Sequence, residues 1–242
     1  MSARTEATDV AEAAASAAPA ALIQGLQGAL DSEDAARAAW AIRNVRGLSS
    51  PALNSLLSTA MRHGDSYVRK TAVEVAKALD ALEVMRAKIG CLQDEEVNVR
   101  ESAVASLEGH AGTEVKDALL RALTDPFWTV RKVAVEALKF DASLEVTTAL
   151  RQTLGGDEDG EVRRSALVAL WSRVEAEEQA QWARRCVRDC DTSLRLETVR
   201  LIETAPLGAR RALLEPLLVD ASAMVRNAAA RALARVQEPV PD

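Results

Sequence analysis

The sequence has few of the residues that most often build metal and redox sites. Its 242 residues include two histidines, His63 and His110, and three cysteines. A histidine-rich metal site cannot be built from two histidines, and structural zinc sites usually need four protein ligands. An odd number of cysteines in a long chain indicates reduced thiols rather than a disulfide framework. We therefore expect neither a metal nor a cofactor.

Long apolar stretches are also missing, and no segment approaches the roughly 20 apolar residues that a membrane helix needs. Glu6, Asp9 and Glu12 lie where a secretory signal would carry positive charge. These features predict a cytoplasmic protein without a membrane contact. The net charge of −6 argues against a wholly basic domain that coats nucleic acid.

Sequence motifs of catalysis are absent as well. The chain has no glycine-rich phosphate loop, no nucleophile elbow and no His-Glu-x-x-His pattern. Cys186 and Cys190 are four residues apart on one predicted helix, but no second pair of metal ligands is near them in sequence. With aromatic residues at only 3% of the chain, alanine, leucine and valine must fill the interior. We favour a non-enzymatic role.

A short pattern of aspartate, a spacer, Val-Arg, two residues and alanine recurs along the whole chain. Its arginines are 31 or 32 residues apart and define seven repeats. In most repeats an aspartate lies six residues before the arginine, whereas the second repeat has Asp65 four residues before it. Trp40 takes the alanine position of the first repeat, and we expect Trp40 and Trp182 to be core or cap residues. The anchor arginines are Arg37, Arg69, Arg100, Arg131, Arg163, Arg195 and Arg226.

Each repeat is predicted to contain two helices, because apolar residues recur at three- and four-residue spacing on both sides of the aspartate. Helix breaks fall between these segments, for example at Ser50-Pro51, Asp125-Pro126 and Gly155-Gly156. Almost no strand signal remains. The small alanine of the pattern lets neighbouring helices approach closely, which favours stacking of consecutive hairpins. The sequence therefore predicts an all-α fold of about seven helical hairpins.

The pattern, as in Asp125 to Leu138 and Asp220 to Leu233, resembles HEAT repeats, particularly the short variety of the phycobilin-lyase-type HEAT-like proteins. The resemblance covers about residues 18–236. It implies a right-handed α-solenoid, flanked by a flexible N-terminal segment over residues 1–17 and a flexible C-terminal tail over residues 237–242. In this family the repeated aspartate and arginine bond along the stack, so we interpret them as structural residues.

The same resemblance implies that the second helices of the repeats line a concave face, where such proteins bind their partners. Positions one, five and eight residues after each anchor point away from the buried valine and alanine. Trp171 has two interpretations: an interface anchor near an arginine, or a packing residue between the fifth and sixth repeats. The predicted partner-binding residues are Val168, Trp171, Leu196, Arg200 and Arg231.

Charge is distributed unevenly along the chain. The segment from Arg163 to Arg235 holds thirteen arginines, no lysine and nine acidic residues, a net charge of +4, and the remainder totals −10. We therefore expect an acidic partner to bind the C-terminal half. The predicted function is that of a monomeric, non-enzymatic scaffold or adaptor that binds a protein partner in its concave groove. Nucleic acid binding is not expected.

Two enzyme classes that use this architecture remain alternatives. A bilin lyase or isomerase would hold an open-chain tetrapyrrole in an apolar groove with arginine on its propionates, and Trp171 with Arg200 is compatible with that. A HEAT-like alkylpurine DNA glycosylase is the weaker alternative, because the pI is about 5.2 and no Trp-Asp constellation matches. HEAT-repeat hydroxylases bind iron through His-Glu pairs, and neither His63 nor His110 forms one.

Overall fold

The computed structural model describes residues 20–32, 34–203 and 207–237. Within these ranges the chain is helical and contains no β-strand, so the predicted all-α fold class is confirmed. The chain divides into two compact units, Met1–Ala122 (the N-terminal unit) and Leu123–Asp242 (the C-terminal unit). The predicted flexible segment 1–17 lies outside the described residues, as do residues 238–242. Gln237, assigned to the tail by the sequence, ends the last helix instead.

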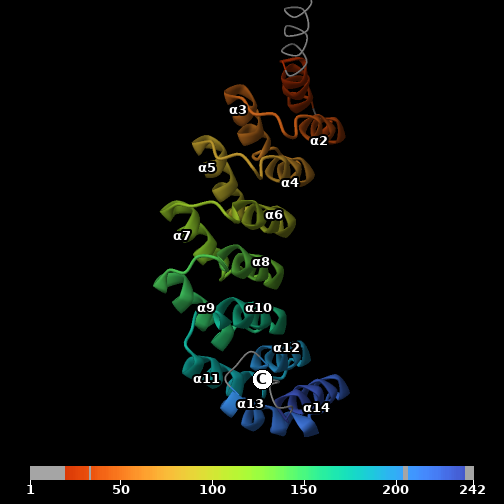
Figure 1. The fold of residues 1–242 in the computed structure, drawn as a ribbon. Helices are drawn as coiled ribbons and strands as arrows, with labels where there is room; N and C mark the ends of the chain where they lie inside the picture. Colours follow the sequence, from red (N-terminus) through yellow and green to blue (C-terminus); the bar gives the residue numbers. More distant parts are fainter. Residues whose placement is uncertain (1–19, 33, 204–206, 238–242) are drawn as a thin grey trace, which may run out of the picture. The chain divides into compact units, whose positions relative to one another are not determined.

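In the N-terminal unit the helices form two rows (Figure 1). One row is formed by α2, α4 and α6, with α2 packed on α4 and α4 packed on α6, and the other contains α3 packed on α5. Residues 20–30 form the first described helix. The elements that follow are α2 (Ala35–Asn44), α3 (Pro51–Ala60), α4 (Ser66–Val75), α5 (Leu82–Gly90), the 3-10 helix η1 (Cys91–Gln93), α6 (Val97–Leu107) and α7 (Thr113–Ala122).

The C-terminal unit repeats this arrangement (Figure 1). The row of second helices runs α8, α10, α12 and α14, each packed on the next, while α11 packs on α13 in the other row. The elements are α8 (Trp128–Leu138), α9 (Leu144–Gly156), α10 (Gly160–Trp171), α11 (Ala176–Cys186), α12 (Thr192–Ile202), α13 (Leu207–Leu214), the 3-10 helix η2 (Glu215–Val219) and α14 (Ala223–Gln237).

Aspartates four residues before an anchor arginine begin several second helices. Asp65 accepts the backbone N–H of Tyr67 at the start of α4, at 2.9 Å. Asp159 and Asp191 cap α10 and α12 in the same way. Such a side chain satisfies an amide that has no partner within the helix, worth about 1 kcal/mol. The aspartate that looked displaced in the second repeat is therefore a helix cap.

Aspartates six residues before an anchor have a different role, because they pair with the arginine of the preceding repeat. In the N-terminal unit Arg69 donates to Asp94 from Nε and Nη2, each bond 2.7 Å long. In the C-terminal unit bidentate bonds of 2.6–3.0 Å join Arg131 to Asp157, Arg163 to Asp189 and Arg195 to Asp220. We call these four pairs the arginine ladder. The structural interpretation of the repeated aspartate and arginine is confirmed for them.

The ladder is buried and fully hydrogen-bonded. The side chains of Arg195 and Asp220 are 10% and 7% exposed. Arg195 Nη1 also donates to the carbonyl oxygens of Asp189 and Cys190 in its own turn, at 2.9 and 3.1 Å. Hydrogen bonds from Arg195 lower the pKa of Asp220, against a smaller, opposite effect of burial. The carboxylate therefore stays ionised between two repeats and fixes their register.

Small residues let the second helices pack closely. Three residues after the anchor, the alanines of five repeats are completely buried, and four residues before each of them lies a buried valine. Because alanine has no side chain beyond Cβ, helices can approach to about 8–10 Å without a cavity. The alanines are Ala72, Ala103, Ala134, Ala166 and Ala229.

The first repeat departs from the predicted register. Arg37 is exposed and Trp40 is 66% exposed, whereas Ala38 and Ala39 are fully buried. Trp40, which the sequence assigned to a core or cap position, therefore does not lie in the core. The second repeat carries His63 six residues before its anchor, so it offers no carboxylate at the position where the ladder would need one for Arg37. The fully buried alanines of α2 therefore lie one and two residues after Arg37, whereas in five other repeats a fully buried alanine lies three residues after the anchor.

Candidate functional site

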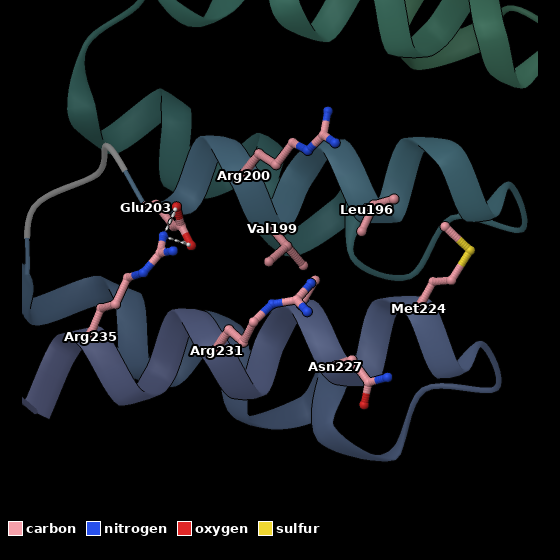
Figure 2. A pocket seen from close by; sticks show the side chains of 9 residues that line it. Leu196, Val199, Arg200, Glu203, Met224, Asn227, Arg231 and Arg235 are labelled. Atoms are coloured by element: carbon pink, nitrogen blue, oxygen red, sulfur yellow. Dashed lines mark hydrogen bonds and ion pairs between the residues drawn. The ribbon is translucent and has the colours of Figure 1, made fainter.

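The described part of the C-terminal unit has an open cleft between the two last second helices, α12 and α14 (Figure 2). Its volume is about 420 Å³. Because α12 and α14 pack on each other, residues about 30 positions apart in the sequence meet there. The lining residues are Leu196, Val199, Arg200, Glu203, Met224, Asn227, Ala228, Arg231 and Arg235.

One part of the cleft is apolar. Val199 is buried at the base of α12, Leu196 is half-buried one turn before it, and Met224 is 64% exposed on the first turn of α14. A methionine is flexible and polarisable, so it adapts to different apolar partners. Leu196 and Met224 thus expose an apolar patch to water, and Val199 forms the floor beneath it.

The charged part of the cleft contains three guanidinium groups and one carboxylate. Arg235 Nη1 lies 3.1 Å from the nearer carboxylate oxygen of Glu203, and Arg200 Nη1 lies 3.4 Å from Glu197 beside the cleft. Arg231 extends from α14 towards α12 (Figure 2), and it forms no ion pair with any described residue. The cleft is thus positively charged, and the side chain of Arg231 within it is exposed.

Beyond the cleft, the charges on α10 and α12 neutralise one another. Arg164 donates to Glu161 at 2.7 Å and lies 3.9 Å from Glu197, which also faces Arg200. The hydrogen bond from Arg164 lowers the pKa of Glu161 despite partial burial. On the side of α12 that faces α10, acidic and basic side chains therefore pair with one another. On the side that faces α14, arginines outnumber carboxylates.

Three of the five predicted partner-binding residues, Leu196, Arg200 and Arg231, line the cleft. Val168 is 45% exposed on α10 but does not line it. Trp171 is only 7% exposed at the end of α10, so the structure places it in the packing role rather than in the partner-binding set. The helix ends at this residue, and Gln179 of α11 donates to its carbonyl oxygen at 2.6 Å.

Sequence reasoning missed several lining residues. Glu203 and Asn227 do occupy positions eight and one after their anchors, so the positional rule contains them, although they are neither apolar nor basic. Met224 and Arg235 fall outside the rule, two residues before and nine after Arg226. The repeat pattern does not identify these two residues, because the packing of α12 against α14 determines which side chains line the cleft.

A second hollow lies in the N-terminal unit, near the ends of α4 and α6, with a volume of about 810 Å³. Its charged lining is balanced, with Arg46 and Lys77 against Glu74 and Glu108. Glu74 also pairs with Lys70 at 3.6 Å, as expected for neighbouring turns of a helix. This hollow is larger than the cleft but has no preferred sign of charge.

The cysteines do not form a shared site. The prediction that Cys186 and Cys190 lie on one helix is wrong, because α11 ends at Cys186. Burial raises the pKa of the Cys186 thiol to about 12, and Cys190 is exposed beside Arg163, 3.7 Å from its Nη2. A thiol held in its protonated form is a poor metal ligand and a poor nucleophile.

Comparisons with known proteins agree with the repeat architecture. Residues 87–171 match the family described as HEAT repeats, which confirms the resemblance seen in the sequence. No curated protein matches the chain. No helix in the described residues combines the length and apolar character needed to cross a membrane.

Solved structures with similar folds have low sequence identity to this chain. Cex1p is 14% identical with a TM-score of 0.61, over 89% of this chain and 52% of Cex1p. YibA of E. coli is 18% identical with a TM-score of 0.59, over 80% of this chain and 72% of YibA. A chain of the S. pombe condensin Cnd3–Cnd2 subcomplex is 20% identical with a TM-score of 0.55, over 88% of this chain and 32% of that one. The chain thus spans about half the length of Cex1p, and the likeness establishes the HEAT-like solenoid fold.

Proposed function

We propose that this chain is a cytoplasmic, non-enzymatic scaffold that binds a protein partner through the cleft between α12 and α14. The observation that carries the proposal is the meeting of an apolar patch and three arginines in one open cleft. Arginine and methionine are enriched in protein interfaces, where a few such residues supply most of the binding free energy.

The arginine ladder and the cleft divide two roles between them, since the ladder joins repeats and the cleft is open to a partner. The ladder fixes the register of the repeats through buried bonds, whereas the bond between repeats at the cleft, from Arg235 to Glu203, is on the surface. Repeat proteins built in this way commonly use the exposed side of the second helices for recognition. One structural neighbour, a chain of the Cnd3–Cnd2 subcomplex, is itself found in a protein assembly.

Site-specific photo-crosslinking tests the proposal. Asn227 lines the cleft and is exposed, so p-benzoylphenylalanine placed there reaches a bound partner. The matched control carries the same photoreactive residue at Arg211 of α13, which is exposed and does not line the cleft. In cells of the source organism we expect a discrete protein adduct from the Asn227 position alone, abolished by Met224→Asp.

Three results would overturn the proposal. Equal adducts from the two positions would mean that the contact is not specific to the cleft. If neither position gave an adduct, the proposal that a protein partner binds the cleft would be wrong. Adducts that contain nucleic acid or a pigment, without protein, would replace the scaffold by one of the two enzyme classes considered from the sequence.

A further inference from the structure

We infer that the cleft between α12 and α14 recognises an acidic, amphipathic segment of its partner, with a carboxylate on Arg231 and an apolar side chain on Leu196, Val199 and Met224. This inference rests on the proposed function and specifies the chemistry of the partner. It is carried by the arrangement of charged and apolar groups around the cleft.

Arg231 is the central receptor for the carboxylate. The ladder shows what an arginine of this unit does when a carboxylate is in reach: Arg195 donates from Nε and Nη2 to both oxygens of Asp220, at 2.7 and 2.9 Å. Arg231 has the same donors, points towards α12, and has no ion-pair partner in the described chain (Figure 2). A carboxylate from outside would complete the same planar, two-bond geometry.

The other two arginines of the cleft are held only loosely. Arg200 and Arg235 are each 69% exposed, and their ion pairs with Glu197 and Glu203 are on the surface. Exposed pairs of this kind contribute little to stability, so a carboxylate of the partner can replace them. The cleft can therefore accept more than one acidic residue, spaced along the segment.

The apolar patch selects a peptide over a phosphate or a nucleic acid. The side chains of Leu196, Val199 and Met224 cannot form hydrogen bonds with a ligand. Only an apolar side chain of the ligand gains binding free energy by contact with them. Of the described residues that line the cleft none is aromatic, so the cleft has no platform for stacking bases. Glu203 would also repel a polyphosphate backbone. An amphipathic segment that combines Asp or Glu with Leu, Ile or Met meets both requirements.

Labelled helical peptides of about 18 residues test the inference, because this length supports a helix. The first probe carries leucine on one face and glutamate on both sides of it, and two matched probes carry glutamine or lysine in place of glutamate. Fluorescence anisotropy on the full chain is expected to give about tenfold tighter binding of the glutamate probe than of the glutamine probe. Added salt should reduce this difference.

Charge-reversed variants locate the interaction. Arg231→Glu is expected to remove the preference for the glutamate probe and to favour the lysine probe. Arg211→Glu on α13 changes the net charge equally, away from the cleft, and should leave the preference unchanged. Circular dichroism and urea unfolding of both variants verify that each remains folded.

The outcomes separate this inference from the proposed function. Equal affinities for the glutamate and glutamine probes, or a preference that Arg211→Glu removes as effectively as Arg231→Glu, would overturn the inference. Tighter binding of a single-stranded oligonucleotide than of any peptide would overturn it as well. If Asn227 yields its protein adduct and the glutamate probe fails, the scaffold stands without an acidic partner. If the glutamate probe binds and Asn227 yields no adduct, the chemistry of the cleft stands and the cellular scaffold fails.

Discussion

Three of the four ladder pairs lie in the same unit as the cleft and use the same residue type, but the arginines of the ladder and of the cleft have opposite surroundings. Arg195 of the ladder is 10% exposed and shares two hydrogen bonds with Asp220. Arg231 of the cleft lies five residues after its anchor, on the exposed side of its helix, and no described residue pairs with it. The helical position of an arginine thus decides whether it joins repeats or remains available to a partner.

The largest expected effect comes from breaking the ladder. Asp157→Ala leaves the guanidinium of Arg131 buried without its carboxylate, since the two side chains are 8% and 5% exposed. We expect a loss of about 3–5 kcal/mol in the free energy of unfolding, measured by urea titration. Glu203→Ala in the exposed pair with Arg235 is the control and should cost less than about 1 kcal/mol. Similar losses in the two variants would remove the distinction between ladder and cleft.

Trp171 and Val168 sharpen the comparison within a single helix. Trp171→Ala removes a large side chain that is 7% exposed, and it should cost about 3–5 kcal/mol of stability by calorimetry or urea titration. Val168→Ala changes a side chain that is 45% exposed and should stay within about 0.5 kcal/mol. A neutral Trp171→Ala that weakens partner binding would return Trp171 to the partner-binding set.

Lys88 extends the comparison to a buried charge outside the ladder. Its side chain is fully buried, and Nζ donates to the carbonyl oxygens of Lys77 and Leu79, both at 3.0 Å. Burial is the main cause that lowers the pKa of this amine from 10.5 to about 8, and Asp80 opposes it in part. Between these two pKa values, folding is therefore coupled to release of a proton.

The sign of the pH dependence follows from this shift. Between pH 8 and 10.5 the unfolded chain binds more protons at Lys88 than the folded chain does, so stability rises with pH. The gain from pH 8 to pH 9 should be about 1 kcal/mol in urea unfolding. Lys88→Met should abolish this gain. An unchanged slope in the variant would assign the pH dependence to another group.

The smallest effect on stability is expected at Arg231. Since the side chain is exposed and has no ion pair in the described chain, Arg231→Ala should change the free energy of unfolding by less than about 0.5 kcal/mol. The same substitution should weaken binding of the glutamate probe about tenfold in anisotropy titrations. A substantial loss of stability would show that Arg231 belongs with the ladder arginines.

The sequence alone was sufficient for the helices and the repeat length, because apolar spacing is a local property and the pattern returns every 31 or 32 residues. The bonding of the ladder was expected from the resemblance to HEAT repeats, which the repeated aspartate and arginine carry. Leu196, Arg200 and Arg231 could be selected from the sequence, since helical geometry gives the exposed side from one anchor.

The tertiary structure alone decided the burial of Trp171, the register of the first repeat, the enclosure of Lys88 and the contribution of Met224 and Arg235 to the cleft. Trp171 ends its helix, and Gln179 of the next helix, α11, bonds its carbonyl oxygen, so a second element adjoins this end of α10. Lys88 is enclosed because the turn after α4 brings two carbonyl oxygens to its amine. Each of these features depends on a neighbouring element, and the period of a single helix contains no information about what packs against it.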